Sequence, residues 1–302
     1  MHKSVSAAAL ALILLTACAS TAPRTPIAPE RSPAPVALTA AAPEPAANDN
    51  LNAVLWTQTS VERDLVHRAI FRAAQAHLDP AIADPDWDAM PQGERKTPLH
   101  GLRNAVIVDI DETVLDNSPY QARLVREGNE YNEFTWAKWC HEEKAEAVPG
   151  ALEFTRAAAS KGVTVFYLSN RARDLREPTL ANLSRLGFPI AADEDIFLGL
   201  GTVVAGCEQH GSEKGCRREQ ISRKYRVLMQ IGDQLGDFVD VLANTPQGRR
   251  QAIEPYLDWI GERWFMLPNP TYGSWEPALF NNDWRAPAPV RRQAKTNALQ
   301  VD

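Results

Sequence analysis

Cysteine is scarce in this chain of 302 residues, and its four cysteines lack the Cys-x-x-Cys spacing that is usual in zinc sites. Clusters of basic residues are also missing, since 32 lysines and arginines stand against 38 acidic residues, for a formal net charge of −6. A nucleic-acid backbone is therefore not indicated as a partner, because binding to it needs a basic patch. The remaining composition, 44% hydrophobic and 23% charged, is ordinary for a globular protein with a sizeable core.

The N-terminal apolar run, Ala7 to Leu15, is too short to span a bilayer and follows the basic residue Lys3, which is the pattern of an export signal. The next residues, Leu15-Thr16-Ala17-Cys18, resemble the processing box of bacterial lipoproteins, in which the cysteine becomes the lipidated first residue. The alternative is an ordinary secretory signal with an incidental cysteine. We expect residues 1–18 to be a lipoprotein signal with its lipobox Cys18, and the protein to be lipid-anchored in the cell outer membrane, on its periplasmic or surface face.

The segment after this signal contains no aromatic residue. Residues 19–50 include seven prolines and ten alanines, a composition that cannot bury a core and predicts a semi-extended, disordered tether. We therefore expect the folded domain at residues 51–285 and a flexible C-terminal tail at 286–302.

Strand and helix patterns alternate through the folded part. Apolar residues at helical spacing predict a long helix over 52–78, broken near 57–60, and the Pro-, Asp- and Gly-rich stretch 79–102 predicts a loop. Buried strands are predicted at 105–110, 163–168, 227–231 and 264–267, with helices at 150–160, 174–186 and 214–224. This order predicts an α/β fold, with a Rossmann-like parallel sheet flanked by helices. The aromatic-rich insertion at 117–148 is predicted to be a partly helical cap over the ends of the strands.

The first predicted strand belongs to the stretch NAVIVDIDETVLDNSPY, residues 104–120, and ends in carboxylates. Asp109 and Asp111 point to the same face of an extended chain, with Ile110 opposite. Burying an unpaired carboxylate costs several kcal/mol, so such a cluster persists where the strand end is exposed or where a cation compensates its charge. The sequence must therefore supply that compensation elsewhere.

Polar residues follow two other predicted strands at the same edge of the sheet, and a lysine precedes a predicted helix. These residues are Ser169 and Asn170, Asp233 and Asp237, and Lys214. Carboxylates, a hydroxyl, an amide and a lysine suit phosphoryl transfer, and carboxylates with open water positions suit Mg²⁺. Taken singly, these residues have ordinary alternatives as a helix cap, a turn or a solvated charge. We interpret the segment 116–119 (DNSP) as turn and cap chemistry rather than catalysis.

The motifs DIDET, LSNR, the Lys214 segment and GDQLGDF resemble the four motifs of the haloacid dehalogenase (HAD) superfamily. The longer strings AVLWTQTSVE, PGALEF and LPNPTYGSWE resemble its class C acid phosphatases, and among them the outer-membrane lipoprotein 5′-nucleotidases. The resemblance covers about residues 51–280. It implies a HAD-type fold and the hydrolysis of extracytoplasmic nucleoside 5′-monophosphates and related esters through an aspartyl-phosphate intermediate.

The resemblance also implies roles for individual residues. Asp109 would be the nucleophile and Asp111 the general acid and base, with Ser169 and Lys214 as phosphate contacts and Asn170 beside them. Mg²⁺ would be held by Asp109, the backbone carbonyl of Asp111, Asp233 and, from the first or second shell of ligands, Asp237. Trp136 and Tyr272 match the aromatics that sandwich the nucleotide base.

Two rival functions and several structural questions stay open on sequence alone. One rival is a broad-specificity acid phosphatase, and the other is a surface lipoprotein that binds an apolar ligand such as haem under its aromatic cap. The carboxylate array argues against haem, because it would be a costly feature for an apolar ligand. Cys207 and Cys216 can form a disulfide across a short loop, remain free thiols, or bind zinc together with His210. Homodimer formation is also left open.

Overall fold

The computed structural model of the chain describes residues 48–301. The predicted signal, its lipobox Cys18 and most of the predicted tether lie outside the described residues. Among the helices of residues 48–301, none is both long enough and apolar enough to cross a membrane.

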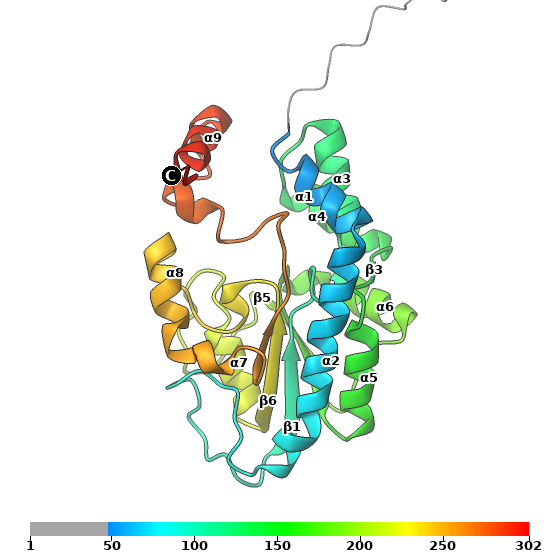
Figure 1. Cartoon of the computed structure of the whole chain (residues 1–302). Coiled ribbons are helices and arrows are strands. Elements are labelled where there is room, and N and C mark those ends of the chain that lie inside the picture. The colour runs from blue at the N-terminus through cyan, green and yellow to red at the C-terminus, as the bar shows by residue number, and fades with distance from the viewer. Residues whose placement is uncertain (1–47, 302) are drawn as a thin grey trace, which may run out of the picture. The chain divides into compact units, whose positions relative to one another are not determined.

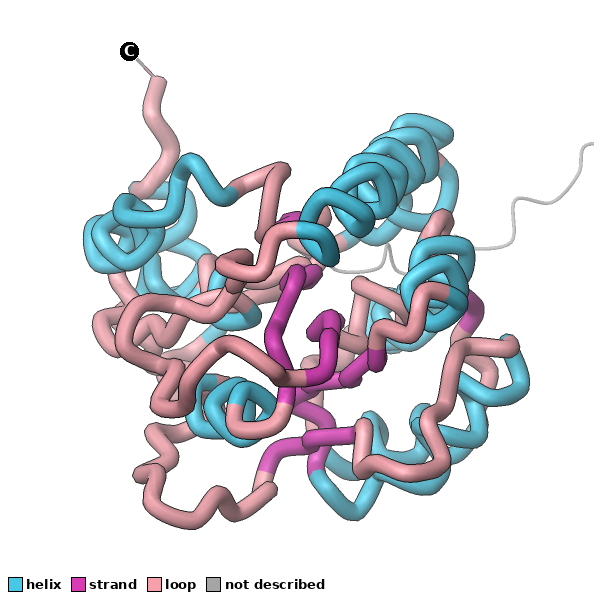
Figure 2. Tube along the Cα trace, turned by 90° about the horizontal axis from the view of Figure 1, so that it is seen from below, coloured by secondary structure: helices cyan, strands magenta, loops and turns pink. Residues whose placement is uncertain are grey.

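A five-stranded parallel sheet forms the centre of the domain, in the order β5-β4-β1-β6-β7 (Figures 1 and 2). Its strands are β1 (Arg103–Val108), β4 (Thr164–Ala172), β5 (Phe197–Leu200), β6 (Tyr225–Gly232) and β7 (Trp264–Met266). All four pairings are parallel, and every residue of β6 is buried. The predicted α/β fold with a parallel sheet is confirmed, and each of the four predicted strands is present.

The fifth strand, β5, is not among the predicted strands because it is short and contains Gly199, which weakens a strand pattern. The structure explains this glycine. A Cβ atom at position 199 would lie 2.8 Å from the carbonyl oxygen of Arg171 and 3.1 Å from the Cα of Arg173. The glycine therefore allows close approach between β5 and the chain that leaves β4.

Helices cover both faces of the sheet (Figure 1). One face carries α2 (Val61–Ala83), α5 (Ala151–Ser160) and α6 (Arg176–Leu186), and the other carries α7 (Gly215–Ser222) and α8 (Pro246–Ile253). The chain moves outward from β1 to β4 and β5, then crosses back to β6 on the other side of β1. Because the crossovers are right-handed, the helices on the way from β1 to β5 and those on the way from β5 to β7 lie on opposite faces. Ligands bind where the strand order reverses in this way.

The predicted helix over 52–78 is two helices, α1 (Leu51–Thr59) and α2, separated at Ser60 as the sequence predicts. The Ser60 side chain accepts a hydrogen bond from the backbone N–H of Arg63 and so caps α2. The prediction of a loop from residue 79 is wrong for its first five residues, since α2 continues through Pro80 to Ala83. A proline in the last turn removes one hydrogen bond but does not end the helix there.

The predicted cap at 117–148 consists of α3 (Ser118–Glu127), α4 (Glu133–Glu142) and a small hairpin of β2 (Leu115–Asp116) and β3 (Glu146–Ala147). The cap is inserted between β1 and α5. It lies beyond the carboxyl ends of the central strands (Figure 1).

The C-terminal part contains more helix than the sequence predicts. Short 3₁₀ helices occur at Leu235–Asp237, Glu254–Trp259 and Pro277–Phe280, and α9 spans Ala288–Asn297. A further 3₁₀ turn at Arg173–Leu175 leads into α6 and belongs to the helix predicted at 174–186. The expected flexible tail at 286–302 is thus helical over most of its length. Ion pairs of Arg291 with Glu130 and of Lys295 with Asp49 and Glu276 tie α9 to the domain.

Candidate active site

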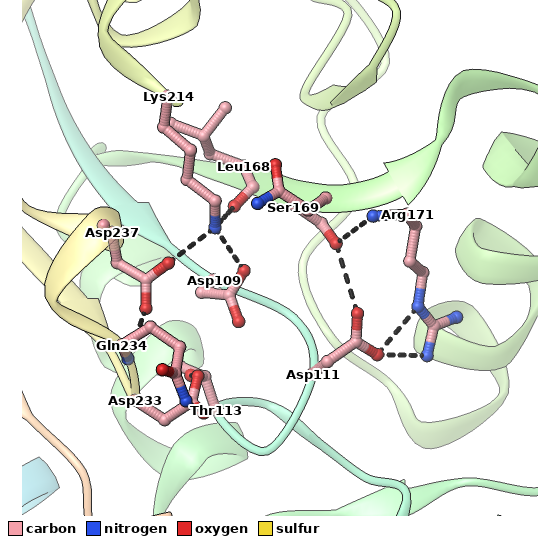
Figure 3. Close-up of polar contacts among 12 residues, drawn as sticks. Asp109, Asp111, Thr113, Leu168, Ser169, Arg171, Lys214, Asp233, Gln234 and Asp237 are labelled. Atoms are coloured by element: carbon pink, nitrogen blue, oxygen red, sulfur yellow. Dashed lines mark hydrogen bonds and ion pairs between the residues drawn. The ribbon is translucent and has the colours of Figure 1, made fainter. Parts of the chain in front are cut away.

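The carboxylates and the lysine singled out in the sequence meet at the carboxyl end of the sheet (Figure 3). Asp109 directly follows β1, and Lys214 is the residue before α7. The Lys214 ammonium donates to Asp109 Oδ1 at 2.5 Å, to Asp237 Oδ1 at 2.7 Å and to the carbonyl oxygen of Leu168 at 2.7 Å. Lys214 thus connects the ends of three neighbouring strands at one point.

Three carboxylates lie around this lysine, which contacts two of them. Asp109, Asp233 and Asp237 are buried, and each offers an oxygen within 4.8 Å of the others. Burial and then the neighbouring Asp237 raise the pKa of Asp233 to about 7. The pKa of Asp109 is also raised, chiefly by burial, although Lys214 opposes this shift. One ammonium cannot balance three carboxylates, so this oxygen-rich set fits a hard divalent cation such as Mg²⁺.

Asp111 faces a second set of donors. Its Oδ1 accepts from Arg171 Nε at 2.9 Å, from Arg171 Nη2 at 2.8 Å and from Asn117 Nδ2 at 2.8 Å. Its Oδ2 accepts from the Ser169 hydroxyl at 3.3 Å. Three donors therefore hold Oδ1, whereas Oδ2 has only the more distant Ser169 hydroxyl.

The side chain of Asn117 does not have the turn and helix-cap role that the sequence predicts. It is the residue before α3, but its side chain makes no capping hydrogen bond. The fully buried amide instead donates to Asp111 and accepts from Trp139 Nε1 at 2.8 Å and from Arg171. Asp116 does form the expected turn, since its Oδ1 accepts from the N–H of Ser118. The interpretation of Asn117 as a helix cap is wrong, because its side chain makes no capping hydrogen bond to α3. It bonds instead with Asp111, Arg171 and Trp139, none of which belongs to α3.

Arg171 is the functional candidate that sequence reasoning missed. Its guanidinium is buried, binds Asp111, and lies 5.3 Å from the centre of the Trp136 ring. The signal in the sequence was its position two residues after Ser169, on the same face of the strand. Alternation along β4 puts both side chains toward Asp111.

Ser169 and Asn170, the predicted phosphate contacts, lie at the end of β4. Ser169 is buried, and its hydroxyl donates to Asp111 Oδ2 while accepting from the N–H of Arg171. Asn170 is exposed, and its Oδ1 accepts from Arg217. Both residues therefore border the site, although Ser169 contacts a carboxylate in this structure.

The segment after β7 closes another side of the site. Asn269 Nδ2 donates to Asp233 Oδ2 at 2.7 Å, and Gln234 Nε2 donates to the same oxygen and to the carbonyl of Tyr272. The Tyr272 hydroxyl donates to Glu112, a buried residue with a positive φ of 58°. These contacts fix the orientation of Asp233.

Trp136 and Tyr272, the predicted base-stacking pair, contact different groups. Trp136 is only 8% exposed, with its ring 5.2 Å from that of Tyr120 and 6.2 Å from that of Tyr131. The aromatic ring contacts of the described residues include no pair between Trp136 and Tyr272. A base inserted between two rings would keep them apart, so the arrangement leaves the stacking role a prediction.

The loop that carries Lys214 is closed by a disulfide. Cys207 and Cys216 are bonded at 2.04 Å with a sequence separation of 9, which selects one of the three alternatives that the sequence leaves open. Cys140 is a buried free thiol.

Fold and site together define an α/β protein with a carboxylate and lysine centre at the carboxyl end of its sheet. The chain belongs to the HAD superfamily, subfamily IIIB (acid phosphatase), whose family model matches residues 32–275. This finding confirms the resemblance to the acid phosphatases of the HAD superfamily and the HAD-type fold.

Individual relatives agree with this assignment. The class C acid phosphatase of Bacillus anthracis superposes with a TM-score of 0.71 at 31% identity, over 84% of this chain and 97% of that one. A second structure of that protein, with tungstate bound, has 32% identity at the same coverage. The stem 31 kDa glycoprotein of Glycine max is 32% identical over 55% of this chain, and acid phosphatase 1 of Solanum lycopersicum is 28% identical over 56%. The chain spans about three-fifths of the length of these two curated relatives, 58% and 59% respectively.

Proposed function

We propose that this protein is a metal-dependent phosphomonoesterase that hydrolyses nucleoside 5′-monophosphates and related esters outside the cytoplasm. The observation that carries this proposal is the contact of Lys214 with both Asp109 and Asp237 beside the Arg171-bound Asp111. A nucleophile, a proton carrier and a fixed cation then face one volume. Two relatives are named acid phosphatases, and one of them binds tungstate, a tetrahedral oxyanion like phosphate.

In the first step, an Asp109 oxygen forms a bond to phosphorus as the ester P–O bond breaks. Asp111 gives its proton to the leaving alkoxide. The Lys214 ammonium holds the Asp109 carboxylate in place and stabilises negative charge on the phosphoryl oxygens.

In the second step, Asp111 removes a proton from water, and the resulting hydroxide attacks phosphorus. The bond between phosphorus and Asp109 breaks, which restores the carboxylate and releases inorganic phosphate. The donors Arg171 and Asn117 keep Asp111 in position between the two steps.

The residues that would hold Mg²⁺ are Asp109, Asp233 and Asp237, with the backbone carbonyl of Asp111 as the further ligand that the family resemblance implies. A bound Mg²⁺ would neutralise charge on the carboxylates and on the phosphoryl oxygens. The hydrogen bonds from Asn269 and Gln234 would orient Asp233 toward it.

A broad-specificity phosphatase is the second candidate, and the burial of Trp136 in the cap favours it. In that case Trp136 would pack the cap rather than contact a base. The nucleotide preference rests on the family resemblance, whereas the lipid anchor at Cys18 and the outer-membrane location rest on the signal and lipobox pattern of residues 1–18.

The experiment that tests this proposal measures phosphate release from a panel of monoesters, with Mg²⁺ and with a chelator. We expect turnover that is lost with the chelator and restored by Mg²⁺, and a higher kcat/KM for nucleoside 5′-monophosphates than for a small aliphatic phosphate. No phosphate release from any ester by metal-loaded protein would refute the proposal. Equal kcat/KM across the panel would leave the broad phosphatase.

A further inference from the structure

Arg217, on the first turn of α7, has a fully buried guanidinium whose hydrogen-bond partners are oxygen atoms without negative charge. Its five hydrogen bonds within the described part of the chain all go to carbonyl oxygens. They join Nη1 to Ser169 O (2.6 Å) and Leu198 O (3.4 Å), and Nη2 to Asn170 Oδ1 (2.7 Å), Ser212 O (3.1 Å) and Glu213 O (3.2 Å). The adjacent Arg218, also buried, pairs instead with the carboxylates of Glu94 and Asp240.

A buried cation without a bonded carboxylate is costly, and here the nearby carboxylates of Asp109, Asp240 and Asp237 offset part of that cost. Burial lowers the pKa of Arg217 to about 10, which leaves the group charged at neutral pH. Its contacts with Ser169 and Asn170 place this charge directly behind the end of β4. An anion bound in front of these two residues would offset it.

Arg217 also determines the orientation of the Asn170 amide. A guanidinium has only donors, so the amide atom that faces it must be the oxygen, Oδ1. The NH₂ end of Asn170 then points away from Arg217, and none of the hydrogen bonds within residues 48–301 uses Nδ2 of this exposed residue. Two N–H donors are thus left for a ligand.

The same side chain connects Asn170 to the loop before α7. The carbonyls of Ser212 and Glu213, which Arg217 binds, immediately precede Lys214. The buried guanidinium of Arg217 therefore sets the spacing between the Asn170 donor on β4 and Lys214 on the loop.

We propose that Arg217 is a positioning residue that holds the Asn170 amide and the Lys214 loop for one phosphoryl group. This inference rests on the proposed function. It predicts that Arg217 matters for binding the phosphoryl oxygens and not only for the stability of the fold.

Arg226 offers a matched control because it is a similar buried arginine at the start of β6, far along the strand from Asp233. It is 7% exposed and donates to Asn104 Oδ1 at 3.0 Å and to the carbonyls of Ile82 and Asp84. We would compare Arg217→Met with Arg226→Met by isothermal titration calorimetry with inorganic phosphate in the presence of Mg²⁺. Thermal unfolding and the kinetics of phosphate release would be measured on the same proteins.

We expect both variants to lower the unfolding temperature, but only Arg217→Met to raise the Kd for phosphate, by about tenfold or more, the size found for partners that orient a ligand. The KM for esters should rise with it. Equal changes in the two variants would overturn the inference. A wild-type protein that binds phosphate but hydrolyses no ester would refute the proposed function, while the Kd comparison would still test Arg217.

A double-mutant cycle decides the case if Arg217→Met does not fold. Arg217→Lys keeps the charge but loses the two-pronged guanidinium. We expect Arg217→Lys to raise the Kd for phosphate at least about threefold less in the Asn170→Ala background than in the wild type. Additive effects of Arg217→Lys and Asn170→Ala would show that Arg217 does not act through Asn170 and would contradict the proposal.

Discussion

Lys214 and Asp109 are 105 residues apart in the chain, yet the ammonium lies 2.5 Å from the carboxylate. Neither residue is distinctive alone, because a lysine before a helix is ordinarily a solvated charge. In the structure Lys214 is 3% exposed and offsets two of the three buried carboxylates. The roles of single residues here come from such pairings rather than from residue type.

The substitution Asp109→Asn tests the nucleophile. The amide keeps the shape of the side chain but cannot attack phosphorus, so we expect kcat to fall by at least about a thousandfold while the fold is retained. Turnover of metal-loaded protein and its circular dichroism spectrum would be measured together. Asp79→Asn, at a largely exposed aspartate outside the site, is the control and should leave kcat unchanged. Turnover of Asp109→Asn within tenfold of wild type would contradict the assignment.

The loop between Cys207 and Cys216 is the element on which the proposed phosphate site depends most directly. It carries Lys214 two residues before the second cysteine, and Arg217 binds its carbonyls from the next position. The disulfide and Arg217 thus restrain the same loop from two sides. By the loop-entropy relation, a disulfide of this separation contributes about 2 to 3 kcal/mol.

Reduction of this disulfide should loosen the Lys214 loop. We expect a dithiol reductant to raise the KM for phosphate esters severalfold, with a smaller effect on kcat, because the loop must be ordered at each binding event. Thiol counting would verify reduction, and Cys140→Ser, which leaves the disulfide intact, should respond to the reductant as wild type does. An unchanged KM in fully reduced protein would show that the disulfide does not support the lysine.

The cap helix α4 separates the two candidate functions through Trp136. If Trp136 stacks on a base, Trp136→Ala should lower kcat/KM for nucleoside 5′-monophosphates by about fivefold to a hundredfold and change that for a small aliphatic phosphate much less. If it only packs the cap against Tyr120 and Arg171, both substrates should be affected alike. Measurement of kcat/KM for the two substrates decides, and equal losses would retire the nucleotide preference.

Across residues 48–301, the sheet and its helices form one core, with the carboxylate and lysine network at one end of the sheet. Other buried polar groups lie outside that network. One is His67 of α2, which is 1% exposed and bonded through Nδ1 to the Arg63 carbonyl at 2.6 Å. Burial lowers its pKa below the ordinary value of 6.5. The folded chain therefore disfavours the protonated ring.

This lowered pKa predicts how stability depends on pH. Below about pH 6.5 the unfolded chain binds a proton at His67 that the folded chain resists, so the stabilisation present above pH 6.5 is lost as the pH falls. Urea unfolding at pH 7.5 and pH 5.5 should show a smaller decrease for His67→Asn than for wild type. Substitution of the exposed His210 by asparagine should leave the decrease as in wild type. An identical decrease in all three proteins would show that His67 does not titrate with unfolding.

The local pattern of the sequence predicted the strands and the polar residues at their ends because both depend on residues close together in the chain. Apolar runs such as 105–108 identify buried strands, and alternation placed Asp109 and Asp111 on one face. Because parallel strands end at the same edge of a sheet, the sequence alone also placed Asp233 and Lys214 at that edge. The sequence did not predict the short strand β5, because Gly199 interrupts its apolar pattern. Position 199 is glycine because a Cβ atom there would lie too close to the chain that leaves β4.

By itself, then, the sequence determined the α/β class, the cap insertion, and the carboxylates and the lysine that form the centre. Only the tertiary structure decided that Asn117 binds Asp111 rather than capping α3, and that Arg171 and Arg217 orient the groups around it. The physical reason is that a side chain with several hydrogen-bonding options adopts the one that leaves fewest buried polar groups unsatisfied. That choice depends on partners brought together by folding, which no local pattern contains.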